Sequence, residues 1–122
     1  MRLAIMGLAL VAGISQAGSR DTEPIVTALD LFEACTGTSN SHHPVCFAYI
    51  RGFSDGNRWL LRDSPVVGLE AAPQAVCIPN AEPVVRAADL FVARFRHSRE
   101  ELSTLSPFRA LSMALSSRYP CG

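Results

Sequence analysis

Four cysteines are the residues of this chain whose types and spacing point most directly to chemistry: Cys35, Cys46, Cys77 and Cys121. No two of them show the C-x2-C spacing that is typical of zinc sites. An even number of cysteines in an exported chain indicates disulfide bonds. We therefore expect two disulfides rather than a metal centre or a thiol nucleophile.

The other candidate groups do not form a catalytic set. The chain has no G-x-S-x-G, no H-E-x-x-H and no glycine-rich phosphate loop. His42 and His43 stand together in a polar stretch, where histidines are usually solvated, and only His97 could join them around a metal. Asp55 and Asp63 lie on a similar helix face with arginines nearby, which is typical of a solvated surface. We predict a binding protein with no catalytic residues, no metal and no cofactor.

The N-terminus carries the pattern of an export signal. Arg2 precedes an uncharged apolar run from Leu3 to Ile14, and Ser15-Gln16-Ala17 supplies small residues for a signal peptidase. We predict a signal peptide over residues 1–17, too short to cross a membrane, and a periplasmic domain over 18–122. The chain has 11 basic residues, all arginine, and 11 acidic ones. This balance gives no bulk attraction to nucleic acid or to a membrane after cleavage.

Apolar periodicity predicts four helices in the mature domain. They run from Pro24 to Cys35, from Pro44 to Leu61, from Asn80 as N-cap to about Arg96, and from Ser106-Pro107 to Tyr119. A short turn is expected from Ser98, and an irregular connection over residues 62–79. No window alternates at period two, so the fold class predicted is all-α, a small four-helix, disulfide-stapled bundle.

Three features of these helices carry specific expectations. Gly52 and Gly56 lie one turn apart, and we expect a neighbouring helix to approach closely there because glycine has no side chain. Trp59 is expected in the core, since a tryptophan in so small a domain is more often buried. Phe108 belongs to the apolar stripe of the last helix and is also expected to be buried.

The order of the helices favours one of the three disulfide connectivities. In a simple up-and-down bundle, Cys35 and Cys46 lie at one pole, while Cys77 and Cys121 lie at the other. The favoured pairs are therefore Cys35–Cys46 and Cys77–Cys121. An HdeA-like packing would instead bring Cys35 to Cys77, so this alternative remains open.

The residues around the second cysteine resemble a known family signature. The run Cys46-Phe47-Ala48-Tyr49-Ile50-Arg51-Gly52-Phe53-Ser54-Asp55 is similar to the Cys-x-Gly-Tyr-Ile-x-Gly-x-x-Asp pattern of the Rap/Tai family. Cys77-Ile78-Pro79 and Ala114-Leu115, followed by Tyr119-Pro120-Cys121, resemble later family motifs in the same order. Ala48 replaces a usual glycine, and His97-Ser98 stands where the family commonly has His-Pro. The resemblance covers most of the mature chain.

The resemblance implies a function that depends on binding alone. Rap/Tai proteins are immunity proteins that occlude peptidoglycan amidase effectors of type VI secretion, often as dimers. The implied partners are thus an amidase and a second copy of the chain. Candidate contact residues are His97, Arg99, Glu100 and Glu101 after the third helix, and Arg51, Arg58 and Arg62 along the second. Two alternative hypotheses are an HdeA-like periplasmic stress or chaperone protein and an envelope-associated binding module.

Overall fold

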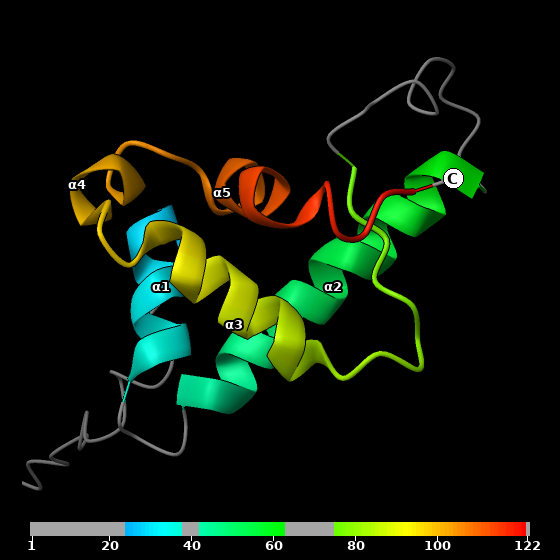
Figure 1. Cartoon of the computed structure of the whole chain (residues 1–122), viewed down its shortest axis with the longest axis horizontal. Coiled ribbons are helices and arrows are strands. Elements are labelled where there is room, and N and C mark those ends of the chain that lie inside the picture. Colours follow the sequence, from blue (N-terminus) through cyan, green and yellow to red (C-terminus); the bar gives the residue numbers. More distant parts are fainter. Residues whose placement is uncertain (1–23, 38–41, 63–74, 122) are drawn as a thin grey trace, which may run out of the picture.

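The computed structural model describes residues 24–37, 42–62 and 75–121, without the side chains of His42 and Arg62. These residues form helices and no strand (Figure 1). The helices are α1 (Ala28–Thr36), α2 (His42–Arg62), α3 (Val84–Phe95), α4 (Arg99–Leu102) and α5 (Pro107–Leu115). The all-α prediction is confirmed, with the single turn α4 added to four longer helices. The segment predicted as a signal peptide, Asp63 and most of the irregular connection lie outside the described residues.

Helix α1 begins later than the predicted start at Pro24, because a capping box fixes its first turn. The Thr27 hydroxyl accepts a hydrogen bond from the Asp30 amide, and the Asp30 carboxylate accepts one from the Thr27 amide at 2.8 Å. The amides of Thr27 and Val26 both donate to this carboxylate, and they hold the pKa of Asp30 below its ordinary value. The pattern Thr27-x-x-Asp30 could have revealed this start in the sequence.

The sequence predicts the start of α5 correctly and the start of α3 wrongly. The prediction that α3 begins at Asn80 is wrong, since its first residue is Val84. Glu82 precedes Pro83, and a residue before proline is disfavoured from helical geometry. The start of α5 is confirmed: the Ser106 hydroxyl accepts a hydrogen bond from the Arg109 amide, with Pro107 in the first turn.

A single apolar core lies among the helices. Helix α1 contacts each of the other four, and α3 packs against both α2 and α5. Phe32 of α1 meets Phe91 of α3 edge to face, with ring centroids 6.2 Å apart. The largest fully buried apolar side chains are Phe91, Phe95, Leu31, Ile50, Ile78, Leu102, Leu111, Leu115 and Val76. Every helix therefore contributes to the core, together with the extended residues that precede α3.

Three expectations about α2 and α5 are wrong. The Cβ position of neither Gly52 nor Gly56 has an atom within 4 Å among the described residues beyond the helix's own backbone, so none of the described helices approaches closely there. Trp59 is 56% exposed, because the buried residues of α2 lie on a different face of this helix. Phe108 is 59% exposed, because it lies about 100° around α5 from the buried Pro107.

Candidate protein-binding surfaces

The structure contains the two disulfides that the helix order favoured. Cys35–Cys46 joins the end of α1 to the start of α2, and Cys77–Cys121 joins the segment before α3 to the C-terminal residues. The Cα atoms of each pair are 4.9 Å apart. Together they tie α1 to α2 and the C-terminal residues to the segment before α3, so the surfaces described below rest on a cross-linked frame.

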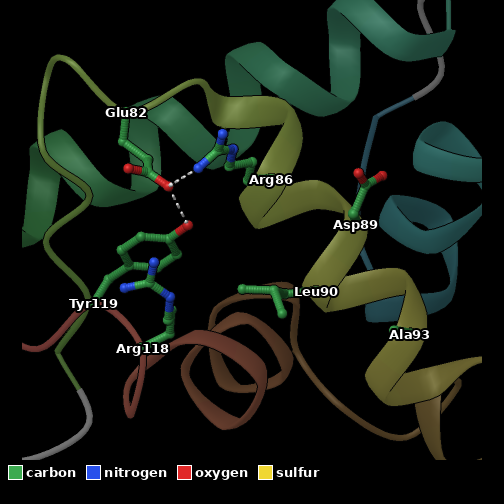
Figure 2. Close-up of a pocket in the computed structure, with 7 residues that line it drawn as sticks. All are labelled: Glu82, Arg86, Asp89, Leu90, Ala93, Arg118 and Tyr119. Carbon is green, nitrogen blue, oxygen red and sulfur yellow. Dashed lines mark hydrogen bonds and ion pairs between the residues drawn. The ribbon is translucent and has the colours of Figure 1, made fainter.

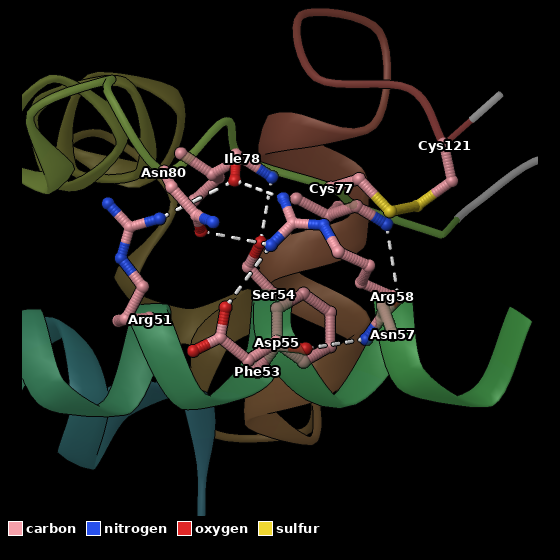
Figure 3. The surroundings of a disulfide bond; sticks show 11 residues. Arg51, Phe53, Ser54, Asp55, Asn57, Arg58, Cys77, Ile78, Asn80 and Cys121 are labelled. Carbon is pink, nitrogen blue, oxygen red and sulfur yellow. Dashed lines mark hydrogen bonds and ion pairs between the residues drawn. A yellow bond between two sulfur atoms is a disulfide. The ribbon is translucent and has the colours of Figure 1, made fainter. Parts of the chain in front are cut away.

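Polar residues of α2 hold the extended segment 75–82 against that helix (Figure 3). The fully buried hydroxyl of Ser54 accepts a hydrogen bond from the Ile78 amide at 2.7 Å. The Asn57 side-chain oxygen accepts one from the Val76 amide at 3.0 Å. These bonds replace the water that the segment's backbone would otherwise need.

Two of the arginines predicted as partner contacts are engaged within the chain. Arg51 donates to the carbonyl of Glu82 at 2.9 Å and to those of Ile78 and Pro79 at 3.4 Å. Arg58 donates to the same Ile78 carbonyl, and its guanidinium also reaches the side chains of Asn80 and Asp55 at 3.2 and 3.4 Å (Figure 3). Both side chains are only partly exposed. The geometry of Arg51 and Arg58 fits a role in fixing segment 75–82. The side chain of Arg62, the third predicted arginine, lies outside the described residues.

Helix α4 presents the other predicted contact residues on a fixed turn. The Arg99 guanidinium lies 3.7 Å from the Glu33 carboxylate and over the Phe32 ring, 5.6 Å from its centroid. Leu102 is buried, and the Ala28 amide donates to the Leu105 carbonyl at 3.0 Å. Leu102 and the backbone bond therefore hold α4 against α1, and Arg99 adds an exposed ion pair on the surface.

The remaining residues of this turn face solvent. His97, Glu100 and Glu101 are exposed and form no ion pair with the described residues. The hydroxyls of Ser103 and Thr104 donate to the carbonyls of Glu100 and Glu101, each at 2.8 Å. The Ser98 side chain makes no capping hydrogen bond, although the sequence fits a capping box. We call His97, Glu100 and Glu101 the α4 surface.

A charged pocket of about 410 Å³ lies between α3 and the C-terminal turn (Figure 2). One Glu82 carboxylate oxygen accepts a hydrogen bond from the Tyr119 hydroxyl at 3.2 Å and lies 3.9 Å from the Arg86 guanidinium. Burial raises the pKa of Tyr119, and the bond to Glu82 raises it further. Asp89 and Arg118 also line the pocket. Its two acids balance its two arginines, so it carries no net attraction for a charged ligand.

A second hollow of about 470 Å³ runs between α2 and the start of α5, and the sequence did not predict it. Phe108 stacks on Phe53, with centroids 5.6 Å apart, and on Tyr49, at 6.2 Å. We call this hollow the α2–α5 groove; it is lined by Ala48, Tyr49, Gly52, Phe53, Gly56, Asn57, Leu60 and Phe108. The spacing of Gly52 and Gly56 is the sequence signal of this hollow.

The α4 surface, the charged pocket and the α2–α5 groove are the candidate binding surfaces among the described residues. They hold no group of three or more histidine, cysteine, aspartate or glutamate side chains placed to bind a metal ion. Among the same residues, none of the helices is both long and apolar enough to span a membrane. A family model described as Rap1a immunity proteins matches residues 27–121, a range that includes all five helices. Comparisons with curated proteins and with solved structures give no match.

Proposed function

The chain belongs to the Rap1a family of immunity proteins, and from this membership we propose that it binds and occludes a peptidoglycan amidase effector of type VI secretion. The observation that carries the proposal is the family match over nearly the whole described chain. Protection would come from binding alone, with no reaction carried out by this chain. The partner, an amidase, is the one that the sequence motifs imply.

We further propose that the protein acts in the periplasm after its signal peptide is removed. Two disulfides suit an oxidising compartment, because cytosolic thiols are normally kept reduced. Peptidoglycan lies in the same compartment, so the inhibitor would meet the amidase beside its substrate. A homodimer is part of the proposal, and sedimentation equilibrium of the mature protein would show it as twice the monomer mass.

The α4 surface is the proposed site of contact with the rim of the amidase cleft. Glu100 and Glu101 offer two carboxylates that suit basic groups on a partner, and His97 lies at the same turn. Arg99 would act by holding the turn through Glu33, which reduces the ordering cost of binding. Arg51 and Arg58 would act in the same indirect way, by fixing segment 75–82.

Calorimetry with purified amidase effectors tests this proposal. We expect nanomolar affinity for a cognate amidase and at least about tenfold weaker binding by Glu101→Arg, since reversing a rim charge places like charges together. Asp89→Arg on α3 is the matched control, because it reverses an exposed acid that forms no ion pair with the described residues.

The results of this experiment test the α4 contact and the amidase-binding function separately. Equal affinity of Glu101→Arg and the native protein would exclude the α4 surface as the contact. Absence of binding by the native protein to any amidase from the same genome would contradict the function. The periplasmic stress hypothesis would then be tested next, by measuring exposure of apolar surface in acid.

A further inference from the structure

The α2–α5 groove is the more apolar of the two hollows described above, and nothing in the described chain fills it. Its floor is formed by Gly52 and Gly56, whose missing side chains leave open space. Phe108 forms one wall and is 59% exposed, and Leu60 at one end is 39% exposed. Exposing large apolar side chains to water is unfavourable, so a group of them along one groove indicates an interaction site.

The charge pattern of the groove defines what it can bind. None of its eight lining residues is charged, whereas the pocket beside Tyr119 has four charged residues. Its single amide side chain, Asn57, already donates to the Phe53 carbonyl at 2.8 Å and accepts from the Val76 amide. Both polar atoms of the Asn57 side chain thus keep a hydrogen-bond partner when an apolar group binds, while a charged occupant would lose its water without compensation.

The shape of the groove favours a helix as occupant. Ala48, Gly52 and Gly56 lie four residues apart, so they form a strip of small residues along two turns of α2. Small residues at this spacing allow the backbone of a second helix to approach closely. Tyr49 and Phe53 stand beside the strip and stack with Phe108, so the walls are already ordered before a partner binds.

We infer that the α2–α5 groove binds the apolar face of an amphipathic helix of the effector protein. This inference rests on the proposed function, because membership of an immunity family requires a partner-binding surface. Interface centres are depleted in charge and enriched in aromatic side chains, as this groove is.

Filling the groove tests the inference without harming the fold. In Gly56→Leu the added side chain meets no atom at its Cβ and replaces a poor helix former. We expect the melting temperature of the oxidised protein to stay the same or rise, by about 4 °C. Affinity for the amidase that the native protein binds should fall about tenfold or more, since the groove is then occupied. Ala93→Leu, which places the same side chain at an exposed position of α3, should leave affinity unchanged.

Three results would overturn this inference in distinguishable ways. Unchanged affinity of Gly56→Leu would exclude the groove while leaving the amidase immunity function intact. A native dimer that Gly56→Leu converts to a monomer would show that a second copy, and not an effector helix, occupies the groove. Failure of the native protein to bind any amidase tested would contradict the proposed function and remove the effector as occupant.

Discussion

The hydrogen bond between Ser54 and the Ile78 amide offers a quantitative test of how the segment before α3 is held. The Ser54 hydroxyl and the Ile78 side chain are both fully buried, and their bond is 2.7 Å long. Ser54→Ala removes the acceptor and leaves a buried amide that water does not reach. An unsatisfied buried group of this kind costs about 1–3 kcal/mol. For a domain of about 100 residues, that corresponds to a fall in melting temperature of about 4–8 °C for each kcal/mol.

Thermal unfolding of the oxidised mature protein, followed by circular dichroism, measures this effect. Thr104→Ala is the matched control, because it removes an exposed hydroxyl whose bond to the Glu101 carbonyl is local. The control should change stability by less than about 0.5 kcal/mol. Hydrogen exchange should also show faster exchange of the Ile78 amide in Ser54→Ala. If Ser54→Ala and Thr104→Ala had the same melting temperature, the claim that α2 fixes this segment through Ser54 would be refuted.

Three further predictions concern the elements that support the surfaces. Asp30→Ala should cost about 1 kcal/mol at pH 7 in urea titrations. The pKa of Asp30 is lowered in the folded state, so its contribution to stability is complete above the ordinary aspartate pKa and is lost as pH falls through the folded pKa. An equal loss of stability for Asp30→Ala in strong acid would contradict this prediction. Replacing Cys77 and Cys121 by serine should cost about 4 kcal/mol for this loop length, measured by thermal unfolding; no loss would show that the bridge is dispensable. Arg58→Met should cost about 1–2 kcal/mol in the same assay, because the Ile78 carbonyl loses a charged donor, and equal stability would exclude that role.

Periodicity and local capping predicted most of the fold, as the start of α5 illustrates. Ser106 and Pro107 act only on their own first turn, so their types are sufficient to locate the helix. The start of α3 was missed because two local rules compete there. Asn80 is a good N-cap residue, but Pro83 keeps Glu82 out of helical geometry, and this effect decides the outcome.

The candidate surfaces were harder to predict, because they depend on which side of a helix the rest of the chain covers. The glycine pair in α2 indicated close approach, but the sequence could not show whether the approaching helix belongs to this chain. Phe108 fits the apolar stripe of α5 by spacing, yet a residue at the edge of a stripe can lie outside the core. Arg51 and Arg58 looked like surface contacts because their backbone acceptors lie more than 19 residues away along the chain.

A titration of peptidoglycan cleavage is the most direct test of the central claim. The purified mature protein would be added in steps to a cognate amidase effector, and the release of cleaved peptide would be measured at each step. The account predicts that cleavage falls in proportion to the added protein and stops near a fixed stoichiometric ratio. Cleavage that continues at the same rate with the protein in excess would contradict it.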